Sequence, residues 1–347
     1  MTTPLQTLLG TALPIIQAPM AGVQGTALAV AVCEAGALGS LPCAMLSVET
    51  MRSQVALIKA KTVRPFNVNF FCHAPPMADP ECEARWRTAL SPYYQEFGLD
   101  VDHIAPGPGR SPFSQEAADA LNEFKPAVVS FHFGLPADQL LAQVRSWGSK
   151  ILSSATTVEE ALWLEAKGVD AVIAQGLEAG GHRGHFLSDD LTRQMGSLAL
   201  LAQVVRAVKV PVIAAGGIAD AKGVAAAMAL GAAGVQVGTA YLLCPEATTS
   251  AVHRAALQSD GARHTALTNM FTGRPARGIV NRLMRELGPM SASAPAFPLA
   301  TMAIAPLRAK AESRGSGDFS PLWSGENSLG CKEVPAAQLT RELASGL

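Results

Sequence analysis

The sequence has few aromatic residues and no excess of charge of either sign. Aromatic residues make up 5% and charged residues 16% of the 347 positions, and the formal net charge at pH 7 is −1. This balance argues against a surface that binds nucleic acid or an anionic membrane. Hydrophobic residues make up 49% of the chain, so a sizeable core can form and wholesale disorder is not expected.

Paired cysteine motifs, a targeting segment and a membrane span are also missing. The six cysteines show no CxxC spacing, so we expect free thiols, with a Cys72–Cys82 disulfide as the alternative. The N-terminus has no basic stretch followed by an apolar segment and a cleavage site. No window is long and apolar enough to cross a bilayer. We therefore expect a cytoplasmic protein, either a monomer or a homodimer.

Short β-branched runs alternate along the chain with glycine turns and amphipathic Ala/Leu segments. This alternation is typical of parallel strands joined by crossover helices. The number of predicted strands is the number that closes an α/β (β/α)8 TIM barrel. A doubly wound open sheet is the alternative, although no GxGxxG follows the first strand. The predicted strands cover residues 14–20, 37–42, 66–71, 127–133, 150–155, 171–176, 211–217 and 234–240.

Helix signals lie between these strands, and two regions interrupt the alternation. Thr157 and Asp220 are predicted N-caps of helices that stop at Gly168 and Gly231. Residues 72–114 read as a helix and an irregular loop inserted after the third strand. Residues 248–347 read as a helical addition that covers one barrel face. We therefore predict a barrel domain over 1–247, insertion included, and a C-terminal extension over 248–347.

Glycines mark the ends of the last two predicted strands, at Gly216–Gly217 and at Gly238–Thr239. In this fold the loops after strands seven and eight are the usual phosphate site. Glycine lets backbone N–H groups approach an anion, and a following helix N-terminus favours negative charge. The two correctly spaced elements predict phosphate binding. Tight turns without a ligand are the alternative.

The segment QGLEAGGHRGHF follows the sixth predicted strand. Gln175 ends the strand, and Gly180 and Gly181 would allow backbone contact with a flat ligand. His182 follows directly, and an imidazole can take a proton or steady an anion near neutral pH. A surface-loop histidine is the simpler alternative.

A metal site in the same segment is a further alternative. His182 and His185 would be two ligands and Glu178 a third. The set is small and no helical HExxH frame exists, so we predict no metal.

Two polar residues stand in otherwise apolar strands. Strand alternation sends Phe131 and Phe133 to one face and His132 to the other, which at a strand's C-terminal end is the ligand side. Asn69 needs a hydrogen-bond partner if buried, because an unpaired amide costs about 1–3 kcal/mol. A ligand or the backbone could supply that partner, and a satisfied core histidine is the alternative for His132.

Several of these segments, in their order and spacing, resemble the nitronate monooxygenase family in its bacterial-type branch. The similarity extends over residues 5–280 and more loosely to WSGEN at 323–327. SFHFG combined with EAGGHRG is the specific part. The segments are PIIQAPMAGV, FNVNFFCH, SFHFG, QGLEAGGHRG, AAGGI and VQVGTA.

The resemblance implies non-covalent FMN, with His182 and His132 as catalytic residues beside the reactive ring. It also implies oxidative denitrification, in which an alkyl nitronate and O2 give an aldehyde or ketone and nitrite. An FMN-dependent NAD(P)H reductase of quinones or enoyl thioesters, and a catalytically idle phosphate-binding barrel, remain alternatives. The implied cofactor-binding residues, with the neighbouring glycines, are Met20, Asn69, Gln175, Gly180, Gly181, Gly216, Gly217, Gln236, Val237, Gly238 and Thr239.

The sequence departs from the family pattern near the expected substrate. Phe297, Thr301 and Ala305 stand where relatives have two tyrosines and a lysine. A lysine there can pair with a substrate carboxylate. Its absence predicts neutral alkyl nitronates in a more apolar pocket, unless Arg110 or Lys310 supplies the positive charge.

Overall fold

Eight parallel strands form the barrel that the alternation predicts, with β1 paired to β9 and the order continuing through β8, β6, β5, β4, β3 and β2. The computed structural model describes residues 2–77, 79–101, 103–104 and 109–347. A bridge between Ile16 and Leu38 joins the two end strands, so the ring is nearly closed. The strands are β1 (Ile15–Gln17), β2 (Gly39–Pro42), β3 (Phe66–Phe71), β4 (Val128–His132), β5 (Lys150–Ala155), β6 (Ala171–Gln175), β8 (Val212–Ala215) and β9 (Gly234–Val237).

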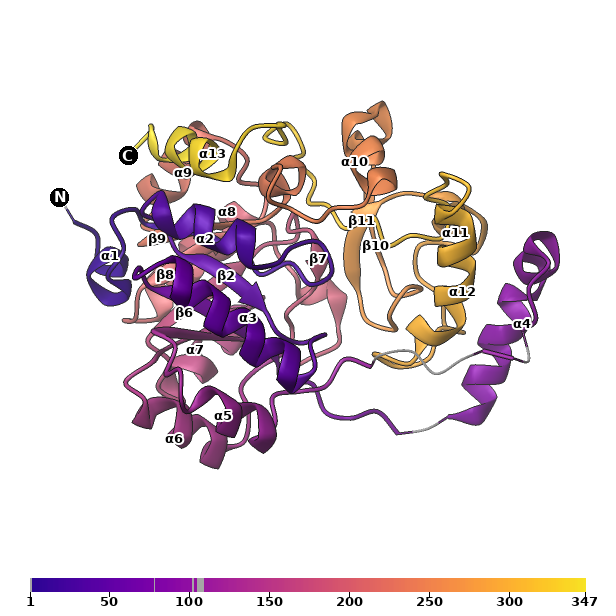
Figure 1. Ribbon diagram of the computed structural model, residues 1–347, viewed down its shortest axis with the longest axis horizontal. Coiled ribbons are helices and arrows are strands. Elements are labelled where there is room, and N and C mark those ends of the chain that lie inside the picture. The colour runs from indigo at the N-terminus through magenta and orange to yellow at the C-terminus, as the bar shows by residue number, and fades with distance from the viewer. Residues whose placement is uncertain (1, 78, 102, 105–108) are drawn as a thin grey trace.

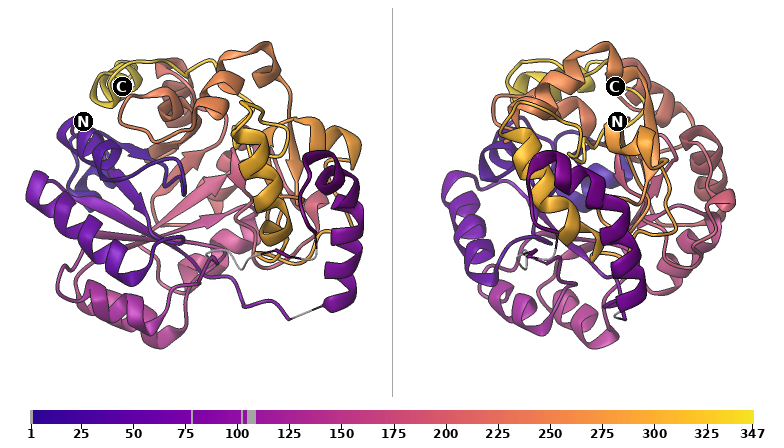
Figure 2. Two further views of the ribbon diagram at one scale, coloured as in Figure 1. Left: turned by 45° about the vertical axis from the view of Figure 1, so that its right-hand side comes forward. Right: turned by 90° about the vertical axis from the view of Figure 1, so that its right-hand side faces the viewer.

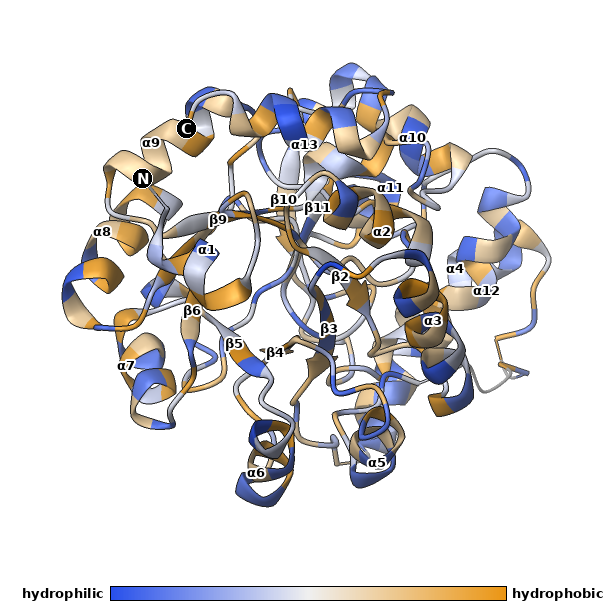
Figure 3. Cartoon of the chain, turned by 60° about the vertical axis from the view of Figure 1, so that its left-hand side comes forward, coloured by the Kyte–Doolittle hydropathy of each residue, from blue (hydrophilic) through white to orange (hydrophobic). Residues whose placement is uncertain are grey.

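Helices surround the strands, as the end-on view in Figure 2 shows. Figure 3 shows their alternating hydrophobic and hydrophilic residues, the pattern of helices with one buried face. The side chains of Thr157 and Asp220 accept hydrogen bonds from backbone N–H groups in the first turns of α7 and α9. Both predicted N-caps are therefore confirmed. The barrel helices are α2 (Thr26–Glu34), α3 (Val48–Lys61), α5 (Gln115–Leu121), α6 (Asp138–Ser146), α7 (Val158–Ala166), α8 (Ser197–Ala207) and α9 (Ala221–Ala229).

The barrel interior is layered from an apolar floor to a polar upper part. Helix α1 (Pro4–Leu9) closes the floor, where Leu5 and Leu9 pack on the first residues of the strands. Above this floor the Asn67 amide donates to the Ser40 and Ser130 hydroxyls at 3.0 and 2.9 Å. The C-terminal strand ends lie above this layer, which is the functional face of the fold.

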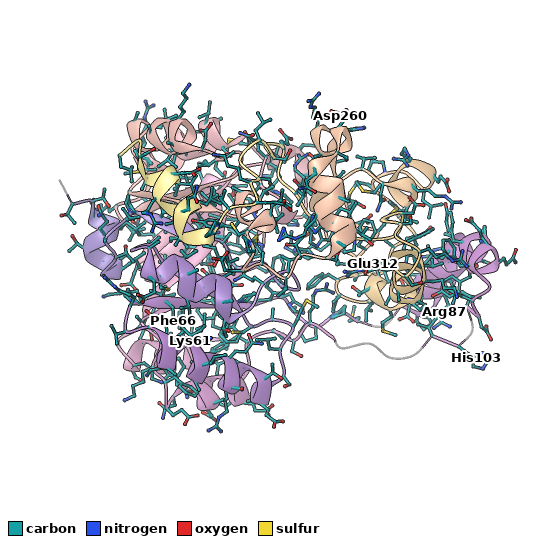
Figure 4. All side chains as sticks on the ribbon, turned by 45° about the horizontal axis from the view of Figure 1, so that its top comes forward. Lys61, Phe66, Arg87, His103, Asp260 and Glu312 are labelled. Carbon is teal, nitrogen blue, oxygen red and sulfur yellow. The ribbon has the colours of Figure 1, made fainter. Side chains whose placement is uncertain are left out.

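The insertion packs on the C-terminal part of the chain rather than on the barrel helices. Its helix α4 (Pro80–Phe97) lies beside α12 (Ala300–Glu312), at the right of Figure 1. The Tyr94 hydroxyl on α4 donates to the Ala303 carbonyl at 2.7 Å. Figure 4 labels one residue on each of these two helices, Arg87 on α4 and Glu312 on α12. It also labels Lys61 and Phe66, which lie in the barrel.

The residues after 247 form strands as well as the predicted helices. Strand β11 (Ala276–Ile279) pairs with β10 (Thr265–Thr268) on one side and with β7 (Gly181–His182) on the other, a sheet that the sequence did not predict. The last helix, α13, returns to pack beside α2 and α9 of the barrel. The other elements are α10 (Ala251–Gln258), α11 (Arg282–Glu286), α13 (Ala336–Ala344) and the 3-10 helices η1 (Leu191–Arg193), η2 (Thr239–Leu243) and η3 (Asp260–Arg263). The boundary at residue 247 stays a prediction.

All six cysteines are free thiols, as expected, and the alternative Cys72–Cys82 disulfide is not present. None of the described helices combines the length and the apolar character that a membrane crossing needs.

Candidate active site

A cavity opens at the C-terminal ends of the barrel strands and gathers most of the predicted site residues. Val237 alone does not line it, because its side chain is buried in the core and its carbonyl accepts from the Ala18 N–H at 2.8 Å. The predicted residues that line the cavity are Met20, Asn69, His132, Gln175, Gly180, Gly181, His182, Gly216, Gly217, Gln236, Gly238 and Thr239.

The ends of β8 and β9 form one side of the cavity, which we call the rim: Gly216, Gly217, Gly238 and Thr239. Gly216 and Gly217 have φ values of +114° and +72°, which side chains rarely adopt. Within the described residues, the N–H groups of Gly217, Ile218 and Gly238 donate to no protein acceptor. Several free N–H groups at one edge make a concavity suited to an anion.

The segment around WSGEN closes the rim from above. The Gly325 N–H donates to the Thr239 hydroxyl at 2.9 Å, and the Asn327 side chain donates to the Gly217 carbonyl at 3.0 Å. A Cβ on Gly180 would lie 2.5 Å from the Gly325 nitrogen. Gly180 is therefore needed for packing against this segment, whereas Gly181, with φ +72°, has open space beside it.

His182 lies in β7, where its neighbour Gly181 pairs with Arg277 and His182 itself with Ala276 of β11. Its Nε2 is 3.0 Å from the Thr272 hydroxyl, which in turn donates to the Arg274 carbonyl at 3.4 Å. This chain of bonds assigns the ring proton to Nε2 and leaves Nδ1 with a free lone pair. Burial, followed by the positive charge of Arg110, holds the pKa of His182 well below its usual value. The imidazole is therefore neutral near pH 7.

His132 lines the same cavity but has a protein partner on each ring nitrogen. Nε2 donates to the His182 carbonyl at 3.1 Å, and Nδ1 accepts from the Ser154 hydroxyl at 3.0 Å. Burial lowers the pKa of His132 to about 3. The Gln175 side chain donates to the same His182 carbonyl at 3.0 Å and accepts from the Gly184 N–H at 2.8 Å. Together these two side chains fix the backbone that carries His182.

The alternative metal set does not converge. His185 is buried and contacts Asp189 at 3.4 Å. Glu178 instead accepts from the backbone and hydroxyl of Ser197 at the start of α8. Within the described ranges, no group of three His, Cys, Asp or Glu side chains could hold a metal ion.

Two amides lie in the cavity wall with contrasting partners. Asn69 donates to the Ser130 carbonyl at 3.2 Å and hydroxyl at 2.9 Å, so the protein supplies the partner that its burial requires. The Oε1 atom of Gln236 is buried without a hydrogen-bond partner in the described part of the chain. A buried unpaired amide oxygen is costly, so it indicates a missing donor.

On the His182 side of the cavity lies a group of side chains that we call the roof: Arg110, Phe297 and Trp323. The His182 ring is 5.3 Å from the Phe297 ring and 5.5 Å from the Trp323 ring. The Arg110 guanidinium is 5.9 Å from the centre of the Phe297 ring. The sequence analysis had named each of these residues for a different reason. Phe297 departs from the family pattern, Arg110 was a possible compensating cation, and Trp323 belongs to the WSGEN segment, where the similarity is looser.

The other positions of the departing segment lie differently. The Thr301 hydroxyl accepts from Nη1 of Arg110 at 2.9 Å and donates to the Phe271 carbonyl at 3.1 Å. Ala305 and Lys310 are exposed on α12 and do not line the cavity. Of the two compensating cations considered, only Arg110 therefore reaches the site.

Comparison with known proteins gives consistent matches over the whole chain. A family model described as nitronate monooxygenase matches residues 2–346. The nitronate monooxygenase of Pseudomonas aeruginosa is 42% identical, over 100% of this chain and 99% of the relative. The crystal structure of nitroalkane oxidase from Streptomyces ansochromogenes has a TM-score of 0.90 and 40% identity, covering 99% and 97% of the two chains. FabK from Thermotoga maritima has a TM-score of 0.73 and 26% identity, covering 99% and 95%.

Proposed function

The chain belongs to the nitronate monooxygenase family, and from this premise we propose that it binds FMN and oxidises alkyl nitronates with O2 to an aldehyde or ketone and nitrite. One observation carries the proposal. The same cavity holds a set of unused backbone N–H groups at the rim and an imidazole, His182, with a free lone pair.

The residues present suit a flavin mononucleotide. The free N–H groups of Gly217, Ile218 and Gly238 would hold its phosphate, as helix-start and glycine-rich loops hold phosphates elsewhere. The unpartnered amide of Gln236 would meet a polar edge of the ring system. When bound, FMN supplies the electron acceptor and the reactivity toward O2 that no side chain provides.

His182 is the candidate catalytic residue. Its neutral ring and free Nδ1 allow it to accept the α-proton of a nitroalkane, which leaves a nitronate in the site and an imidazolium beside it. With a preformed nitronate, the same atom would only contact the substrate. Phe297 and Trp323 pack against the His182 ring.

His132 acts through His182 and not on the substrate. Both of its ring nitrogens are occupied by Ser154 and by the His182 carbonyl, and its pKa of about 3 keeps it neutral. We therefore assign to His132, together with Gln175, the positioning of the His182 backbone.

An absorbance spectrum and a nitrite assay test the proposal. We expect the purified protein to show a flavin spectrum, and to release nitrite while consuming O2 when propyl nitronate is added. A colourless protein that does not bind added FMN at micromolar concentration would contradict the proposal and favour a barrel without redox activity. If the protein carries a flavin but forms no nitrite, the proposed cofactor stands and the proposed reaction is wrong.

A further inference from the structure

Arg110 is a half-buried cation in the cavity wall, and the described residues leave most of its donors unused. The one hydrogen bond that its guanidinium makes to a described residue runs from Nη1 to the Thr301 hydroxyl at 2.9 Å, and none of the described carboxylates pairs with it. A guanidinium has several N–H donors in a fixed fork, so most of its hydrogen-bonding capacity is unused. Burial lowers the pKa of Arg110 to about 10, yet the group stays charged at pH 7.

Two arginines that are fully buried near the cavity, Arg183 and Arg277, have their partners within the protein. Arg183 donates to the Gly176 and Gln175 carbonyls at 2.5 and 2.8 Å and to the Gln194 side chain. Arg277 pairs with Glu326 at 3.0 Å. Arg110 differs from both: the described residues leave most of its N–H donors unused where it borders the cavity, which suits it to pair with an anion that enters there.

The position of Arg110 separates it from the rim. It reaches the cavity from the insertion and packs on Phe297, the ring that His182 contacts from the barrel. The N–H groups of the rim belong instead to the ends of β8 and β9. An anion at Arg110 would therefore lie on the His182 side of the cavity, where a substrate would bind, and not at the phosphate position.

We propose that Arg110 binds a planar pair of anionic oxygens on the substrate, either the nitronate group itself or a carboxylate of the same molecule. This inference rests on the proposed function for the identity of the substrate. The fork of a guanidinium matches such an oxygen pair with two parallel hydrogen bonds. Arg110 would thus supply the positive charge that the sequence left open at this part of the pocket.

Thr301 positions the guanidinium. Its hydroxyl accepts from Arg110 and donates to the Phe271 carbonyl, so it links the insertion to the C-terminal addition. Thr301→Val removes this link and keeps the charge. We expect a several-fold rise in KM with little change in kcat, because the fork is less well oriented.

The test compares Arg110→Met and Arg110→Lys with Lys310→Met, a matched loss of a cation exposed on α12. The substrates are propyl nitronate and the nitronate of 3-nitropropionate. We expect Arg110→Met to lower kcat/KM about 100-fold, mainly through KM, and Arg110→Lys to recover part of the loss. A loss confined to the carboxylated substrate identifies the carboxylate as the ligand, and a loss with both identifies the nitronate. Lys310→Met should match the wild type.

A binding measurement separates this inference from the proposed function. Nitrate and propionate are titrated into the FMN-loaded protein and followed by flavin absorbance and calorimetry. We expect at least one anion to bind, and Arg110→Met to weaken that binding 10-fold or more, whether or not nitronates turn over. If the wild type oxidises nitronates and Arg110→Met keeps its kcat/KM for both substrates and its anion affinities, the inference is wrong. If no nitronate is oxidised but Arg110→Met still loses anion binding, the proposed reaction fails and the anion site stands.

Discussion

The rim and the roof border the same site but are built in different ways. The rim presents backbone N–H groups and comes from two strand ends about one β/α unit apart in sequence. The roof presents side chains, and the bond between Arg110 and Thr301 joins positions 191 residues apart. The rim therefore depends on local backbone geometry that glycine allows, whereas the roof depends on how the insertion and the C-terminal addition pack together.

Breaking the rim should have the largest effect. Gly217→Val places a branched side chain at φ +72° and blocks the approach of a phosphate to the free N–H groups. We expect FMN affinity to fall about 1,000-fold or more, because hydrogen bonds to a charged group are worth about 1.5–3 kcal/mol each. Equilibrium titration of the apoprotein with FMN measures the change.

Gly148→Val is the matched control for backbone strain. Gly148 has φ +77°, has no atom within 4 Å of an added Cβ, and does not line the cavity. Its variant should lose some stability and retain FMN. Normal flavin occupancy in Gly217→Val would show that the rim does not hold the phosphate.

Removing the His182 imidazole should have the second-largest effect. We expect His182→Ala to lower kcat with a nitroalkane by roughly 100-fold or more, within the usual range for a lost general base. FMN affinity should change little, because the His182 side chain is not part of the rim. Steady-state kinetics on the flavin-loaded variant provides the measurement, with His264→Ala, an exposed histidine, as control. Unchanged turnover would remove His182 from the chemistry.

Acid pH should weaken the roof through His253, which donates to the Trp323 carbonyl at 3.1 Å. Burial lowers the pKa of His253 from 6.5 to about 4 in the folded protein. Between these values the unfolded chain binds the proton and the folded protein does not, so stability is lost as pH falls from 6.5 to 4. We expect His253→Gln to reduce this loss by roughly 1–3 kcal/mol. Denaturant unfolding of the wild type and of His253→Gln at both pH values measures the change.

The smallest effect concerns the outer support of the rim. The Tyr241 hydroxyl in η2 hydrogen-bonds the Thr340 hydroxyl in α13 at 2.9 Å. Thr340 also donates to the Ala336 carbonyl, so it keeps a partner when the phenol is removed. We expect Tyr241→Phe to cost about 1 kcal/mol of unfolding free energy and to leave FMN affinity unchanged. A large loss of flavin binding would mean that α13 determines the rim geometry.

The barrel and the rim could be predicted because their determinants are local. Each strand is an apolar run between turn signals, and the glycines at 216–217 and 238 follow two of these runs directly. The N-caps at Thr157 and Asp220 also depend on neighbouring residues alone. Glu160, three residues after Thr157, would complete a capping box at this N-cap, but its carboxylate accepts from Thr156 and from the Phe186 N–H instead. The Phe186 N–H is 26 residues from Glu160 in sequence, and this contact left no local signal.

The roof could not be predicted for the same physical reason. Nothing near Arg110 in sequence indicates that it meets Thr301 and Phe297, since the contact depends on α4 packing against α12. The pairing of β7 with β11 is also non-local, and a two-residue strand carries no periodicity to detect. Val237 was assigned to the cofactor as part of a run, although strand alternation alone would have directed its side chain into the core.

Anaerobic stopped-flow mixing of the FMN-loaded protein with propyl nitronate, and separately with NADH, tests the central claim most directly. If the cavity aligns a bound flavin with a nitronate beside His182, the flavin absorbance should bleach rapidly with propyl nitronate and only slowly with NADH. Rapid bleaching by NADH and none by nitronate would contradict the account, and would instead support a reductase built on the same barrel.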